Sequence, residues 1–119
     1  MRCYISGPMT GIPFCNLPAF FVAEEVLKGL FPELEIVNPA NLGEEAGMKL
    51  EWEYYLRRDL VELLGCEMLV LLDGWRNSRG SVLELVVAQA LGFEIYELVG
   101  GELVERDSKG WDLNLAVEL

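Results

Sequence analysis

The sequence predicts a single-domain α/β protein, flavodoxin-like or more generally Rossmann-like, with an open parallel sheet of four to five strands and helices on both faces. Short apolar runs alternate with longer segments whose apolar residues recur at helical spacing, in the order β-α-β-α-β-α-β. Strands joined through helices pair in parallel with right-handed crossovers. A chain of 119 residues that is 52% hydrophobic suits one domain, residues 1–119, with one sizeable core.

The first predicted elements are a short buried strand at residues 2–6 and a helix at residues 17–30. A turn-rich loop at residues 7–15 separates them. Asn16 is a residue type that caps helix N-termini, and Pro18 is tolerated in a first helical turn. We therefore expect the Asn16 side chain to cap this helix.

The second strand and the second helix are predicted at residues 34–37 and 51–64. The pair Asn38-Pro39 ends the strand, since a residue before proline favours a turn or extended backbone, and a polar loop at residues 40–50 follows. The helix is indicated by apolar residues at helical spacing, namely Trp52, Leu56, Leu60 and Leu63.

The third strand is predicted at residues 68–72, where a continuous apolar run is typical of a central parallel strand. A helix at residues 81–91 and a fourth strand at residues 93–98 follow. The remaining segment, residues 99–119, is expected to hold a turn at Gly100-Gly101, a short strand at residues 103–104, and a tail or short helix.

The chain is strongly acidic, with 9 Lys and Arg against 20 Asp and Glu and a formal net charge of −11. Nucleic-acid binding relies on basic patches, so this balance argues against a nucleic-acid partner. A small nucleoside or nucleotide needs only one or two arginines, for which Arg76 and Arg79 are candidates. No apolar run is long enough for a membrane span and the start lacks the features of a signal peptide, so we expect a cytoplasmic protein.

Cysteine and histidine content limits the chemistry. The three cysteines, Cys3, Cys15 and Cys66, form no CxxC pair and no disulfide framework, and the chain has no histidine. A zinc site is therefore not expected, and Ser-His-Asp or Cys-His catalysis is excluded because the base is missing. We expect no metal and no cofactor.

Four segments are expected to converge at the carboxyl edge of the sheet, where open α/β sheets place their ligands. They are the run YISGPMTG from Tyr4 to Gly11, Asp59, the loop at residues 73–79, and Glu84. Their glycines let backbone approach a ligand closely and free amide groups to bind it. The loop is neither a GxGxxG fingerprint nor a Walker A loop, which argues against hydride transfer and ATP hydrolysis.

Glu84 is the only acidic residue in a predicted helix that is apolar on nearly every side. A buried carboxylate is costly unless it is paired, hydrogen-bonded or chemically employed. The run from Ser81 to Glu84 also fits a capping box, in which Ser81 caps the helix and Glu84 returns a hydrogen bond. The two interpretations have equal weight and need not conflict, because the helix dipole keeps a first-turn carboxylate ionised, as a glycosidic nucleophile requires.

Four other candidates each keep two interpretations open. Asp59 fits a solvated or salt-bridged face, although its helical edge points toward the sheet. Tyr4 is either a plain strand aromatic or a buried hydroxyl partnered by a carboxylate. Asp73 is either a loop cap or a ligand contact, and Trp75 either a surface anchor or a side chain that stacks on a base.

These motifs together resemble the nucleoside 2-deoxyribosyltransferase superfamily, and within it the small, often phage-associated members of unknown function. The resemblance covers about residues 2–98. It rests on YISGPMTG, on Asn38-Pro39-Ala40, on Arg58-Asp59-Leu60, and on DGWRNSRGSVLELVVAQALG after the third strand. The last motif is specific, and the order and spacing of all four strengthen it.

The resemblance implies roles for individual residues. Glu84 is the implied catalytic nucleophile, Asp59 the carboxylate near the leaving base, and Tyr4 the residue that holds the glutamate. Ser78 is implied to contact the sugar or phosphate. The residues expected to bind substrate are Ser6, Gly7, Pro8, Met9, Asp73, Trp75, Ser78, Arg79 and Gly80.

The activity expected from this resemblance is N-glycosyl transfer or N-glycoside hydrolysis on deoxynucleosides or their monophosphates, through a covalent deoxyribosyl-glutamate intermediate. Two carboxylates that flank a glycosidic bond are the recurring device for such chemistry. The alternative is a non-catalytic domain that binds or senses a nucleotide. A homodimer or higher homo-oligomer is expected, because the family enzymes are oligomeric and the hydrophobic content is high for a short chain.

Overall fold

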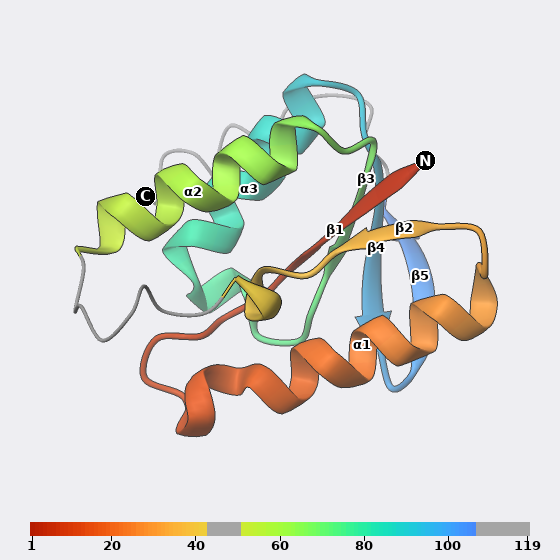
Figure 1. Cartoon of the computed structure of the whole chain (residues 1–119), viewed down its shortest axis with the longest axis horizontal. Helices are drawn as coiled ribbons and strands as arrows, with labels where there is room; N and C mark the ends of the chain where they lie inside the picture. The colour runs from red at the N-terminus through yellow and green to blue at the C-terminus, as the bar shows by residue number, and fades with distance from the viewer. Residues whose placement is uncertain (43–50, 107–119) are drawn as a thin grey trace.

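The computed structural model describes residues 1–42 and 51–106 (Figure 1). Its strands are β1 (Arg2–Ser6), β2 (Glu35–Val37), β3 (Met68–Leu71), β4 (Glu94–Val99) and β5 (Glu102–Arg106). Its helices are α1 (Leu17–Leu30), α2 (Trp52–Leu64) and α3 (Arg79–Ala90), with short 3-10 turns η1 (Pro13–Asn16), η2 (Pro39–Asn41) and η3 (Trp75–Asn77). The expected strands and helices are therefore present, with bounds within one or two residues of those predicted, except that the fifth strand is longer.

The five strands form one sheet in the order β2-β1-β3-β4-β5. β1 pairs in parallel with β2 and with β3, and β3 pairs in parallel with β4. The flavodoxin-like order is thus confirmed, and its switch point lies between the carboxyl ends of β1 and β3. Ligands of open α/β sheets bind in the crevice at such a point.

The fifth strand corrects the expectation of an all-parallel sheet. β5 pairs antiparallel with β4. The connection is the predicted Gly100-Gly101 turn, where both residues have positive φ, 57° and 80°. A two-residue turn of this kind closes a hairpin and leaves no chain for the crossover that a parallel pair requires.

Helices cover both faces of the sheet, as predicted (Figure 1). α1 packs on one face over Cys3, Ile5, Met68 and Val70, and α2 and α3 pack on the other over Tyr4, Leu69 and Leu71. Successive residues of a strand point to opposite faces. Ser6, two residues beyond Tyr4, therefore faces α3 at the carboxyl end of β1.

Asn16 does not cap α1 as predicted. It precedes the helix, but its side chain makes no cap hydrogen bond and its φ of 58° is left-handed. The Asn16 Nδ2 instead donates to the Pro8 carbonyl at 2.9 Å, because the left-handed turn directs the side chain back across the loop. Phe14 and Cys15 share this conformation, with φ of 56° and 53°.

Residues 43–50 of the predicted polar loop and the tail from residue 107 onward lie outside the described residues. Within residues 1–42 and 51–106, no helix has the length and apolar content needed to cross a membrane.

Replacing Leu69 with alanine should lower the free energy of unfolding by about 2–5 kcal/mol, because Leu69 is fully buried in the central strand β3. Val61→Ala on α2 is the control. Its side chain is 65% exposed, so the change should stay within about 0.5 kcal/mol. Urea unfolding of both variants measures the difference, and equal losses would contradict the assigned packing of β3.

Candidate active site

Glu84 is a buried carboxylate at the carboxyl edge of the sheet. Its residue exposure is 6%, and it lies in the second turn of α3, facing β1. The Ser6 hydroxyl donates to Glu84 Oε1 at 2.8 Å. The Tyr4 phenol also interacts with the carboxylate and favours its ionised form. Oε2 is buried and has no hydrogen-bond partner in the described part of the chain.

The capping-box interpretation of Ser81 and Glu84 is wrong. α3 begins two residues earlier than predicted, with Ser78 as its N-cap, and Ser78 Oγ accepts from the Ser81 N–H at 3.2 Å. Glu84 therefore lies beyond the first turn, and its carboxylate reaches β1 rather than the helix start. The Ser81 hydroxyl, which was expected to cap, is buried and has no partner among the described residues.

Burial dominates the titration of Glu84. The pKa of Glu84 is raised from 4.5 to about 7; desolvation is the largest cause, hydrogen bonding to Tyr4 and Ser6 lowers the pKa, and the charge of Asp59 raises it. The helix dipole was expected to keep a first-turn carboxylate ionised, but Glu84 lies in the second turn, and desolvation raises its pKa. Both forms of the carboxyl are populated near neutral pH.

Tyr4 stays protonated over the whole neutral range. Burial raises the pKa of its phenol well above 10, and the charges of Glu84 and Asp59 raise it further. A neutral phenol is a hydrogen-bond donor, which suits it to stabilise the ionised form of Glu84. The buried hydroxyl of β1 thus has the carboxylate partner that one interpretation of the sequence expected.

Asp59 lies on α2 and lines the same cavity as Glu84. Its side chain is 21% exposed, and its Oδ1 is 3.3 Å from Arg58 Nε. Burial raises the pKa of Asp59, Arg58 lowers it, and Glu62 raises it. Asp59 is therefore salt-bridged as one interpretation had it, yet on the cavity side of the helix rather than on a solvated face.

The cavity that contains both carboxylates has a volume of about 440 Å³. Drug-sized ligands occupy cavities of this size. Its wall comes from the loop after β1, from η2, from α2 and from the start of α3. Besides the two carboxylates, the lining includes Gly7, Met9, Thr10, Trp52, Tyr55, Arg58, Ser78, Gly80 and Ser81.

Gly7 allows the loop after β1 to pass close to the sheet. A Cβ at this position would lie 2.9 Å from the Cβ of Leu72, closer than side chains approach. Leu72 is nearly fully buried, so it has no room to move away. A glycine is therefore needed where the chain leaves β1 beside the cavity.

The structure brings most of the sequence-predicted site residues together. Gly7, Met9, Ser78 and Gly80 line the cavity with the two carboxylates, and Tyr4 and Ser6 support Glu84 from β1. Pro8 is buried beside Gly74 and is not part of the lining. Arg79 is exposed and its guanidinium lies over the ring of Trp52, 4.0 Å from the centroid, at the cavity wall.

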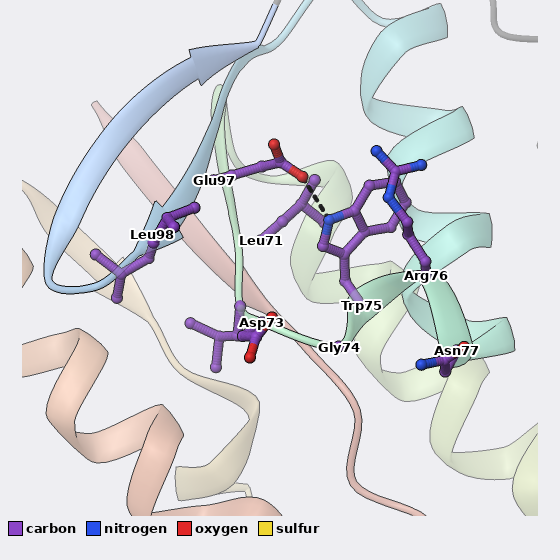
Figure 2. Close-up of a pocket in the computed structure, with 10 residues that line it drawn as sticks. Leu71, Asp73, Gly74, Trp75, Arg76, Asn77, Glu97 and Leu98 are labelled. Atoms are coloured by element: carbon purple, nitrogen blue, oxygen red, sulfur yellow. Dashed lines mark hydrogen bonds between the residues drawn. The ribbon is translucent and has the colours of Figure 1, made fainter.

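Asp73 and Trp75 lie elsewhere, on a second cavity of about 290 Å³ beside β4 (Figure 2). The Trp75 Nε1 donates to Glu97 Oε1 at 2.6 Å, and the indole is 4% exposed. Trp75 is therefore not a surface anchor, and its ring does not border the Glu84 cavity.

Three residues that line the cavity were not predicted from the sequence: the aromatic residues Trp52 and Tyr55, and Ser81. Trp52 and Tyr55 line the cavity one turn apart on α2, on the same edge as Asp59. The spacing 52, 55, 56 and 59 is itself a helical edge that ends in a carboxylate, and this signal was available. The position of Ser81 in the cavity wall was missed because its place in the sequence fits a helix N-cap.

Comparison with known proteins gives a family and a fold. Residues 1–97 match the family described as Domain of unknown function (DUF4406). The chain belongs to this family. No curated protein matches the chain at a significant level. A solved 2-deoxyribosyltransferase from the psychrotolerant bacterium Bacillus psychrosaccharolyticus is similar in structure, with a TM-score of 0.61 and 18% identity over 97% of this chain and 96% of that one. At this identity the likeness shows a shared fold.

The raised pKa of Glu84 predicts a pH-dependent stability. Between pH 4.5 and about 7 the folded carboxyl holds a proton that the unfolded chain has lost, so the free energy of unfolding falls as pH rises through this interval. Glu84→Gln is neutral throughout and lacks this term. The variant should gain up to about 3 kcal/mol relative to the native protein across the interval.

Denaturant titrations of both proteins at several pH values measure this difference. Parallel stability profiles would show that Glu84 titrates near its ordinary pKa and would contradict the buried, weakly compensated carboxyl.

Proposed function

We propose that this protein transfers or hydrolyses the N-glycosidic bond of deoxynucleosides or deoxynucleoside monophosphates, with Glu84 as nucleophile. One observation carries the proposal. Glu84 is held against β1 through Oε1, whereas its Oε2 has no partner and the residue lines a cavity shared with Asp59. The fold shared with a 2-deoxyribosyltransferase supports the same reaction class.

In the first step Glu84 Oε2 attacks the anomeric carbon of the sugar. The C1′–N bond breaks, its electron pair leaves with the base, and a deoxyribosyl ester forms on Glu84. Asp59 delivers a proton to the departing base. Burial raises the pKa of Asp59, and a carboxyl with a raised pKa is suited to act as an acid.

In the second step a nitrogen of another base, or a water molecule, attacks C1′ and releases Glu84. Asp59 accepts the proton that the incoming base or water loses, so protons balance over the cycle. Two displacements at one carbon give net retention of configuration. Transfer and hydrolysis share this path and differ in whether a base or water reaches the ester.

The cavity wall supplies groups suited to a nucleoside. Trp52 and Tyr55 present aromatic rings on which a base can stack. Arg79 lies over Trp52 at this wall, and Ser78 lines the cavity nearby in sequence. We assign the 5′ end of the substrate, as a hydroxyl or a single phosphate, to the side of Ser78 and Arg79.

Glu84→Gln should abolish turnover while the protein stays folded, because an amide is not a nucleophile at C1′ but preserves the side-chain shape. Incubation with a panel of deoxynucleosides and deoxynucleoside monophosphates plus a second free base, followed by mass spectrometry, measures product. Glu97→Gln is the matched control, since that carboxylate lines the other cavity, and it should react like the native protein.

Two outcomes would contradict this assignment. Normal turnover by Glu84→Gln excludes it as nucleophile. Ligand-induced thermal stabilisation of the native protein without any product supports instead a non-catalytic nucleotide-binding domain.

Asp59→Asn should lower kcat by roughly 10²–10⁴-fold, with a smaller effect on binding, because an amide cannot deliver a proton. The loss should shrink for a nucleoside whose base leaves readily without protonation. Glu53→Gln is the control, because Glu53 is an exposed carboxylate in the first turn of the same helix. A rate equal to that control would remove Asp59 from proton transfer.

A further inference from the structure

Ser81 has a buried hydroxyl that the unliganded protein does not use. The residue is fully buried, and its Oγ has no hydrogen-bond partner among the described residues. Its backbone N–H is occupied by Ser78 Oγ, so the cap of α3 does not need the Ser81 side chain. Ser81 nevertheless lines the cavity that contains Glu84.

An unpaired buried hydroxyl destabilises a protein, and most such groups in folded proteins have a partner. Serines in helices commonly donate to the carbonyl one turn earlier, yet Ser81 makes no such bond. Alanine would pack in the same place without this penalty and has a higher helix propensity. The hydroxyl is therefore better explained by a ligand than by the fold.

The stereochemistry of the proposed reaction indicates which group of the nucleoside can reach the Ser81 hydroxyl. Glu84 attacks C1′ from the face of the sugar ring opposite the base. On a deoxynucleoside the 3′-hydroxyl projects from that same face, whereas the 5′ carbon projects from the face of the base. Ser81 precedes Glu84 by three residues, which places the two side chains next to each other on one side of α3.

We propose that the Ser81 hydroxyl binds the 3′-hydroxyl of the sugar and so makes the site selective for nucleosides that carry it. The inference rests on the proposed function, because it takes the attacking face from the role of Glu84. Ser81 and Ser78 then contact opposite ends of the sugar, with Ser78 at the 5′ side and Ser81 beneath the ring.

The test compares a 2′-deoxynucleoside with the matching 2′,3′-dideoxynucleoside. The native protein should favour the deoxynucleoside by about tenfold to a hundredfold in kcat/KM, and Ser81→Ala should lose most of this preference. Comparing the ratio between variants cancels the different intrinsic reactivity of the two substrates. Asp59→Asn is the control, because it should slow both substrates and keep the native ratio.

Binding is measured separately in the Glu84→Gln background, where no turnover interferes. The deoxynucleoside should raise the Tm more than the dideoxynucleoside, and Ser81→Ala should remove that difference. If the native protein converts no nucleoside, the proposed function fails, while this binding comparison still decides the role of Ser81.

Ser81→Ala alone should keep or raise the Tm, because the hydroxyl makes no bond in the free protein. A marked fall in Tm would show a structural role and overturn the proposal. The proposal would also be overturned if Ser81→Ala kept the native preference for the 3′-hydroxyl. It would equally be overturned if the substitution changed the turnover of ribonucleosides alone, because that would mean that Ser81 binds a 2′-hydroxyl. Ser81→Cys, close in size and a weak donor, is a second variant and should likewise keep the native Tm and lose most of the preference for the 3′-hydroxyl.

Discussion

The hydrogen bond from Ser6 to Glu84 joins the end of β1 to the second turn of α3, across 78 positions of the chain. It requires β1 to present Tyr4 and Ser6 to the side of the sheet where α2 and α3 lie. It also requires α3 to lie close to the sheet, which the packing of Val82, Leu85 and Ala88 into the core achieves. The position of the Glu84 carboxylate is therefore set by the hydrophobic core.

The same arrangement has two opposite effects on the pKa of Glu84. Desolvation raises the pKa of Glu84 and two hydroxyl donors lower it, so the group titrates near pH 7. Deeper burial without donors would leave a neutral acid that cannot attack, whereas full solvation would leave a weakly reactive, well-hydrated anion. The polar residues of β1 thus tune a group that the apolar helix alone would neutralise. Sites of this kind commonly lower stability in exchange for reactivity.

The sequence was sufficient to predict the parallel part of the sheet and its helices because apolar periodicity and turn residues are local signals, whereas the antiparallel pairing of β5 was not predicted. It was also sufficient to predict that Glu84 and Asp59 converge, since a carboxylate on an apolar helical edge is conspicuous, and both line one cavity. It was not sufficient to choose between Ser78 and Ser81 as the helix cap, because both serines precede the same helix and only tertiary packing decides where it begins. Trp75 shows the same limit: its loop ends at the carboxyl edge, but its side chain turns toward β4 and away from Glu84.

The close packing of Gly7 limits which positions around the cavity can change by mutation during evolution. The tight approach of Gly7 to Leu72 fixes the chain where it leaves β1, directly after the serine that holds Glu84. Only a few residues further on, Thr10 and Cys15 border the cavity, yet both are exposed. The support of the carboxylate and the exposed rim of the cavity thus lie in adjacent but separate stretches of the chain. Mutation at the rim can therefore reshape the cavity without rebuilding the support of the carboxylate, which leaves the cleft free to diverge in what it accommodates.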